Sequence, residues 1–134
     1  MREYLFRGKG IDNGEWVYGD LWCNPYGKRK VCIVSPINDQ GTTGGNAVNP
    51  ETVGQYTGML DKNGTKIFEG DIIDFLYRSD GDDYGIVQYD VDETEFGFVY
   101  NLIYDGLGRH YCSKDIEVIG NIYDNPEKQF TQVH

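Results

Sequence analysis

Apolar and polar side chains alternate along short segments of the chain, and most of these segments end at glycine, asparagine or aspartate. In residues 15–23 the alternation places Trp16, Tyr18 and Trp22 on one face of an extended segment. A side-chain period of two residues is typical of a half-buried β-strand. The same pattern, or a short apolar run, predicts further strands at Arg2–Arg7, Lys30–Ser35, Ile72–Tyr77, Ile86–Val91, Thr94–Asn101 and Asp115–Gly120.

Turn-forming residues separate the predicted strands. Asp61–Lys62–Asn63–Gly64 is the strongest signal, because an Asn-Gly pair readily takes the positive φ angles of tight turns. Tyr104–His110 is expected to turn the chain into the last strand, and Ser79–Gly85 is a polar, acidic connection. The glycine-rich residues 39–46 predict a flexible loop that buries nothing.

Helices have little room in this sequence. The chain of 134 residues contains 18 glycines and 4 prolines, and the longest stretches free of both are 86–96 and 109–119. Since a mean helix runs about 11–12 residues, few helices fit between these breaks. Tyrosine, valine and isoleucine favour strands instead, so the predicted fold class is mainly β with little helix.

The strand spacing predicts two small β subdomains that together form one domain, residues 1–60 and residues 61–134. In the second subdomain, Gly70 precedes a buried strand, and a hairpin and Gly85 follow it. This order resembles the opening of an SH3-like, partly open barrel. The resemblance is one of fold and carries no information about a ligand.

Acidic residues are concentrated in the second half of the chain. The protein has 12 Lys and Arg against 22 Asp and Glu, a formal net charge of -10. Residues 69–95 hold ten of these carboxylates and a single basic residue, Arg78. Such a surface repels phosphate, so we expect no direct nucleic-acid binding by this half. It suits a basic protein partner, or it serves only to keep the chain soluble.

The three cysteines, Cys23, Cys32 and Cys112, form no C-x-x-C motif. The first residues do not resemble a signal peptide, and no apolar run approaches the roughly 18 residues of a membrane span. We therefore expect a protein without a membrane segment, with reduced thiols in a cytosolic compartment and with Cys32 buried as a small apolar residue. The chain has 2 histidines, too few to favour structural zinc.

Carboxylates between Glu69 and Asp83 are the candidates for metal chemistry. Asp80, Asp82 and Asp83 offer oxygens to Ca²⁺ or Mg²⁺, but they lack the EF-hand pattern and are better explained as an exposed hairpin tip. Glu69, Asp71 and Asp74 could serve a hydrolase, although alternation places Asp71 and Asp74 on opposite faces of a strand.

Nucleophilic chemistry has one candidate pair, His110 and Cys112. Two residues apart on a strand they share a face, but their Cβ atoms then lie about 7 Å apart, which is loose for a hydrogen bond. A half-exposed histidine beside a packed cysteine explains the pair better. We therefore expect no catalytic residues, no metal site and no cofactor.

Five stretches carry longer motifs: MREYLFRG at residues 1–8, GEWVYGDL at 14–21, VNPETVGQYTG at 48–58, DKNGTKIFEGDI at 61–72 and VIGNIYDNPE at 118–127. In this order, and over nearly the whole chain, they resemble the YopX family of phage and prophage proteins. The resemblance implies a mainly β protein from a phage, or from a prophage in a bacterial genome, and we expect it in the cytoplasm of the bacterial host. It implies no catalytic mechanism, and the motifs specify turns and strand starts at least as clearly as a site.

Two classes of function remain open. The first is a non-catalytic accessory or binding protein that engages a basic host or phage protein through its acidic half, with Asp80, Asp82 and Asp83 as partner-binding residues. The alternative is a small metal-dependent hydrolase that uses carboxylates between Glu69 and Asp83.

Self-association is a separate expectation. A partly open sheet leaves edges, and the aromatic face of Trp16, Tyr18 and Trp22 exceeds what one small core covers. We therefore predict a homo-oligomer.

Overall fold

The computed structural model describes residues 3–24, 31–35, 37–38, 41–42, 45–75, 84–100, 103–108 and 112–127. Its elements are β-strands and two short 3-10 turns, which confirms the mainly β class. The chain divides into two compact units, Met1–Tyr56 and Thr57–His134, and the division falls within one strand. Whether residues 1–60 and 61–134 are separate folding units stays a prediction.

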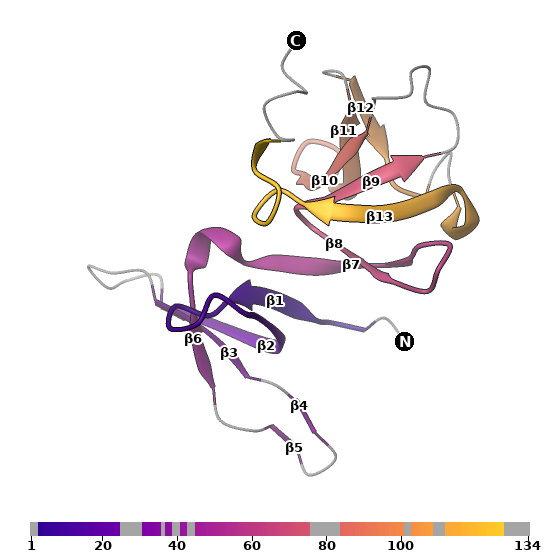
Figure 1. The fold of residues 1–134 in the computed structure, drawn as a ribbon. Helices are drawn as coiled ribbons and strands as arrows, with labels where there is room; N and C mark the ends of the chain where they lie inside the picture. Colours follow the sequence, from indigo (N-terminus) through magenta and orange to yellow (C-terminus); the bar gives the residue numbers. More distant parts are fainter. Residues whose placement is uncertain are drawn as a thin grey trace. The chain divides into compact units, whose positions relative to one another are not determined.

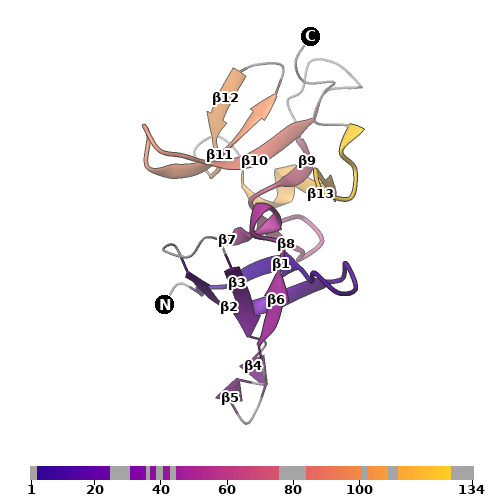
Figure 2. The same ribbon diagram turned by 90° about the vertical axis from the view of Figure 1, so that its left-hand side faces the viewer.

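The N-terminal unit contains β1 (Phe6–Lys9), β2 (Trp16–Asn24), β3 (Val31–Ser35), β4 (Ile37–Asn38), β5 (Gly41–Thr42), β6 (Asn46–Val48), the turn η1 (Pro50–Thr52) and the start of β7 (Gly54–Leu60). Figure 2 shows β6, β3, β2 and β1 of this unit, which are neighbours in this order. Every pairing among them is antiparallel. The short strands β4 and β5 pair with each other.

The four longer strands of this unit return to their starting point. Gly10, just after β1, forms a bridge with Val48 in β6. The amide of Ile11 donates to the carbonyl of Ala47 at 3.0 Å, and the amide of Asn49 donates to the carbonyl of Lys9 at 2.8 Å. These bonds connect β6 to the end of β1, so β1, β2, β3 and β6 form a closed ring.

The ring encloses a small apolar core. Cys32, Val34 and Val48 are buried there, and Val17, Leu21, Cys23 and Val53 pack against them. Gly8 faces the same core, because a Cβ on this residue would lie 2.9 Å from Val48. The alternation of β2 is therefore confirmed: Val17 and Leu21 face inward.

The expectation of reduced thiols is wrong for Cys23 and Cys32, which form a disulfide. Antiparallel pairing of β2 with β3 places the two residues directly opposite each other. Alternation predicts both strands but not the register between them, so this pairing could not be read from the sequence. Cys112 is a free, exposed thiol.

The C-terminal unit holds the rest of β7, followed by β8 (Lys66–Phe68), β9 (Asp71–Phe75), β10 (Gly85–Asp90), β11 (Glu95–Tyr100), β12 (Ile103–Gly106), the turn η2 (Ser113–Asp115) and β13 (Ile116–Asn121). Five of these strands form an antiparallel sheet in the order β12-β11-β10-β9-β13 (Figure 1). A bulge between Val118 and Gly120 shifts the register of β13 against β9.

The core of the C-terminal unit is larger and is formed by Ile67, Ile73, Phe75, Val87, Phe98 and Ile116. The rings of Phe75 and Phe98 lie 5.0 Å apart, centroid to centroid. Gly85 allows this packing, since a Cβ there would approach the Phe98 ring to 2.6 Å. The buried apolar run predicted after Gly70 is thus β9, which supplies two members of this core.

Two predicted loops contain strands. Within residues 39–46, Gly41–Thr42 form β5, and Asn46 begins β6. Tyr104–His110, predicted as a turn, begins inside β12, because pairing with β11 overrides the local turn preference of Asp105 and Gly106. The SH3-like barrel of the second half stays a prediction.

We expect reduction of the Cys23–Cys32 disulfide to lower the free energy of unfolding by about 2–3 kcal/mol, because the link restricts a short loop in the unfolded chain. Urea unfolding followed by tryptophan fluorescence, with and without a phosphine reductant, measures this difference. A C23A/C32A variant is the control, and its unfolding should not respond to reductant. Identical midpoints for the wild-type protein under both conditions would show that the disulfide does not form.

Candidate functional site

The acidic stretch between Glu69 and Glu95 was the main candidate from the sequence. Asp80, Asp82 and Asp83, the predicted partner-binding residues, lie outside the described residues. The described remainder of the stretch ends in the hairpin of β10 and β11. This hairpin carries an acidic tip. Its carboxylates belong to the ten counted between residues 69 and 95, but the sequence did not indicate them as a separate site.

The tip is a structured turn with exposed carboxylates. Asp90 Oδ1 accepts hydrogen bonds from the amides of Asp92 at 2.9 Å and Glu93 at 3.2 Å. Thr94 closes the turn with a φ of 52°. The side chains of Asp92 and Glu93 are exposed, so their charges face solvent.

Apolar side chains lie beside these charges. The rings of Tyr89 and Phe96, opposite each other in the register, meet edge to face at a centroid distance of 5.2 Å. Tyr89 is 44% exposed and Val91 is 77% exposed. Glu95 begins strand β11, and its carboxylate accepts a 3.0 Å hydrogen bond from the Tyr104 hydroxyl. Alternation through Val91 was the signal that could have revealed this apolar surface.

The carboxylates proposed for a hydrolase are not brought together. Asp71 is buried, and its Oδ2 accepts a 2.7 Å hydrogen bond from the amide of Phe68. Asp74 pairs in register with Glu117 of β13 instead. Within the described ranges, no group of three or more His, Cys, Asp or Glu side chains is arranged to hold a metal ion.

His110 lies outside the described residues, so the candidate pair with Cys112 is not tested, and Cys112, which was expected to be packed, is exposed. The Cys112 thiol instead donates to Asp115 Oδ2 at 3.1 Å, and its amide donates to the same oxygen at 2.9 Å. Hydrogen bonds from the amide and then the thiol of Cys112 lower the pKa of Asp115. The contact is a cap on η2.

A surface cleft of about 270 Å³ lies next to this cap. Its lining consists of Lys62, Asp74, Phe75, Lys114, Asp115, Ile116 and Glu117. Lys62 and Glu117 form an ion pair across it at 3.0 Å. Because its lining includes both Lys and Asp or Glu side chains, the cleft offers no strong field of one sign.

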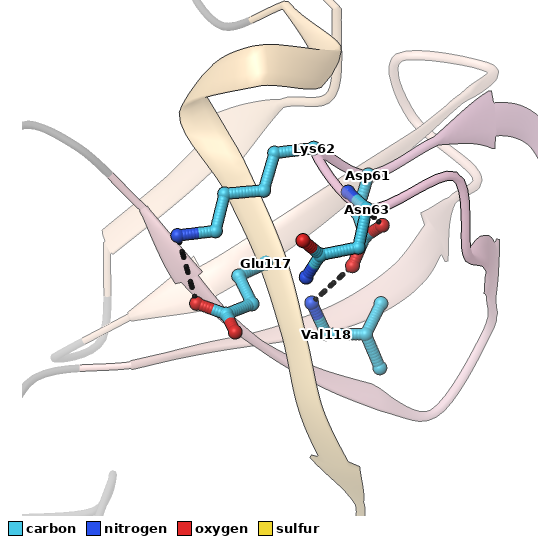
Figure 3. A network of polar contacts seen from close by, with 5 residues as sticks. All are labelled: Asp61, Lys62, Asn63, Glu117 and Val118. Atoms are coloured by element: carbon cyan, nitrogen blue, oxygen red, sulfur yellow. Dashed lines mark hydrogen bonds and ion pairs between the residues drawn. The ribbon is translucent and has the colours of Figure 1, made fainter.

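The Asp61 motif is a structural junction (Figure 3). Asp61 is 4% exposed. Its Oδ1 accepts hydrogen bonds from the amides of Asn63 at 2.9 Å and Thr65 at 2.8 Å, which close the predicted turn. Its Oδ2 accepts a 2.9 Å hydrogen bond from the amide of Val118 in β13. One carboxylate therefore holds the β7–β8 turn against the last strand of the unit.

These contacts also set the acidity of Asp61. Burial raises the pKa of the carboxyl. Hydrogen bonds from the amides of Val118, Thr65 and Asn63 together lower the pKa by more than burial raises it. The net shift is downward from the ordinary value of 3.8. The carboxyl thus remains ionised in the folded protein at pH values where an unfolded chain begins to take up the proton.

The aromatic residues of β2 form the second candidate surface. Tyr18 and Trp22 are exposed, the latter by 58%, whereas Trp16 is partly covered. The guanidinium of Arg7 stacks over the Trp16 ring at 4.5 Å, and Lys9 Nζ lies 5.5 Å from the same ring. Self-association through this face stays a prediction.

Comparison with known proteins agrees with the antiparallel architecture. A solved structure described as "Crystal structure of protein EF1440 from Enterococcus faecalis" is similar, with a TM-score of 0.54 and 19% sequence identity. The match covers 95% of this chain and 98% of that chain. At this level of identity the likeness shows a shared fold and nothing about activity.

The family follows from the sequence match. Residues 5–128 match the YopX protein family, and the chain belongs to it. This confirms the resemblance given by the five motifs. None of the curated proteins compared with the chain matches it. In the part of the chain that the structure describes, no helix has the length and apolar character needed to cross a membrane.

We expect Asp61→Asn to lower the free energy of unfolding at pH 7 by about 1–3 kcal/mol, because an amide cannot accept all three backbone hydrogen bonds. Since the folded pKa is depressed, the wild-type stabilisation is present above the unfolded pKa and is lost as pH falls through the folded value. The difference between wild type and variant should therefore shrink below about pH 4. Urea unfolding between pH 2.5 and 7 measures it.

Glu117→Gln is the matched control for this experiment. It removes a carboxylate of the same network, but one whose ion pair with Lys62 is solvent-exposed. We expect a change within about 0.5 kcal/mol. Equal effects of the two substitutions would contradict the role given to Asp61.

Proposed function

We propose that the protein is a phage- or prophage-encoded accessory protein that acts by binding and not by catalysis. Its partner is a basic host or phage protein, which docks on the acidic C-terminal half. Membership in the YopX family supports a phage-type protein. The partner class is inferred from charge alone.

The acidic hairpin is the single observation that carries this proposal. The β10–β11 hairpin, residues 85–100, contains four carboxylates and no Lys or Arg. The carboxylates of Asp92 and Glu93 are exposed on a turn that their own amides help to fix. A fixed array of like charges attracts a cationic partner and repels phosphate, which favours protein over nucleic acid.

The alternative of a metal-dependent hydrolase has less support. Asp71, one of its proposed ligands, is buried and already accepts a backbone hydrogen bond. A thermal-shift measurement with Mg²⁺, Mn²⁺ and Ca²⁺ tests this alternative, because binding at 100 times Kd stabilises by about 2.7 kcal/mol. We expect no shift.

Poly-lysine is a simple probe of the proposed function. We expect the wild-type protein to bind it with an affinity that falls as salt rises, since the Debye length shortens to about 8 Å at 0.15 M. A D80N/D82N/D83N variant should bind more weakly and retain its fold. Fluorescence anisotropy with labelled poly-lysine at several salt concentrations measures both.

The matched control is D12N/E15Q/E51Q, which removes the same number of charges from the N-terminal unit. It should bind poly-lysine nearly as well as the wild type. Equal losses in the two triple variants would reduce the effect to net charge and contradict a docking surface. Tight, salt-sensitive binding of duplex DNA by the wild-type protein would contradict the proposal as a whole.

A further inference from the structure

The core-facing side of the β10–β11 hairpin continues beyond the core. Along β10, Gly85 and Val87 are buried, but Tyr89, the next residue on this face, is 44% exposed. On β11, Phe98 is fully buried opposite Val87, whereas Phe96 opposite Tyr89 is only partly covered. Val91 follows in the turn at the tip and is also exposed.

The packing partners end where the exposure begins. The core cluster includes Val87 and Phe98 but neither Tyr89 nor Phe96. Tyr89 and Phe96 contact each other edge to face, and Val91 is 77% exposed. The hairpin therefore presents an apolar surface whose strands are held in register and whose outer half lies outside the core cluster formed by the described residues. We call Tyr89, Val91 and Phe96 the hairpin ledge.

Charge restricts what covers this ledge. The β10–β11 hairpin carries Asp90, Asp92, Glu93 and Glu95 and contains no Lys or Arg, and Asp92 and Glu93 are exposed at its tip. A second copy would bring the same carboxylates face to face, and juxtaposed like charges disfavour an association. Nucleic acid would bring phosphates. A partner with apolar side chains beside Lys or Arg satisfies both the ledge and its acidic rim.

We propose that the hairpin ledge, with Asp92 and Glu93, docks a basic amphipathic peptide segment of the partner protein. Apolar side chains of the segment pack on the ledge. Its Lys or Arg side chains pair with the two carboxylates and stack on the exposed Tyr89 ring. This inference rests on the proposed function and assigns it a site, a set of residues and a partner chemistry.

Two synthetic peptides of equal charge distinguish this site from general attraction to an acidic protein. One contains Lys and Leu, and the other contains Lys and Ser in the same positions. We expect the Lys-Leu peptide to bind the wild-type protein about tenfold more tightly, since burial of one or two Leu side chains is enough for that ratio. Isothermal titration calorimetry with each peptide measures the ratio.

Substitutions on the ledge should remove this ratio. Val91→Ser is expected to weaken binding of the Lys-Leu peptide severalfold and to leave the Lys-Ser peptide unaffected. Tyr89→Ser should weaken the Lys-Leu peptide more than the Lys-Ser peptide, which loses only the stacking of Lys on the ring. Since Val91 is in a solvent-exposed turn, Val91→Ser tests the ledge even if Tyr89→Ser disturbs the hairpin. The matched control is Ile11→Ser, which removes an apolar residue that is 64% exposed in the N-terminal unit.

The acidic rim is tested in the same titrations. D92N/E93Q should weaken both peptides and reduce the salt dependence, while D12N/E51Q should change neither. Amide chemical-shift perturbations by the Lys-Leu peptide should be largest for residues 88–97. Perturbations confined to other segments would overturn the assignment.

The outcomes separate this inference from the proposed function. If Val91→Ser and D92N/E93Q bind both peptides like the wild type, and D80N/D82N/D83N still weakens them, the ledge is wrong and the acidic docking function stands. If the wild type binds neither peptide nor poly-lysine, both fail. If light scattering shows that the wild type is a dimer and that Val91→Ser is a monomer, the ledge binds a second copy of the chain. That result would overturn the proposal.

Discussion

A single ionised, buried carboxylate joins the β7–β8 turn of the C-terminal unit to its last strand. The Asp61 carboxylate accepts hydrogen bonds from three backbone amides, two in its own turn and one at Val118 in β13. The amide of Lys62 adds a hydrogen bond to the carbonyl of Ile116 at the start of the same strand. Among the described strands, β13 lies at the edge of its sheet and pairs only with β9 there. The hydrogen bonds to Asp61 and from Lys62 hold β13 on its other edge. Local turn geometry and long-range sheet order depend on the same side chain.

The motifs shared with the YopX family are explained largely by such junctions. Gly70 has a φ of +88°, its carbonyl accepts from the amide of Ile122, and the ring of Tyr123 occupies the space beside it. Asn49 caps η1 by accepting from the amide of Glu51. In each case a short polar side chain or a glycine fixes a chain reversal. In this chain, these motif residues therefore shape turns.

The sequence was sufficient for the parts of the fold that local physics controls. Alternation predicted β2, β10 and β11 closely, and the Asn-Gly turn lies at Asp61–Gly64. Local sequence patterns did not predict features that depend on strand pairing. Strand β12 uses residues with turn preference, and the disulfide depends on the β2–β3 register. The hairpin ledge was missed for a related reason. Alternation identifies a face, but only the structure shows where the layer that covers it ends.

The disulfide has a mechanical consequence for the N-terminal unit. Cys23 and Cys32 are separated by 9 positions and join adjacent strands. When a chain is pulled from its ends, a disulfide prevents the residues between the two linked cysteines from extending. The fully stretched chain is then shorter by the length of that loop. Here that segment corresponds to roughly 30 Å of contour. With the link in place, translocation through a narrow pore would have to carry a doubled strand at this point, whereas the reduced chain could pass one residue at a time.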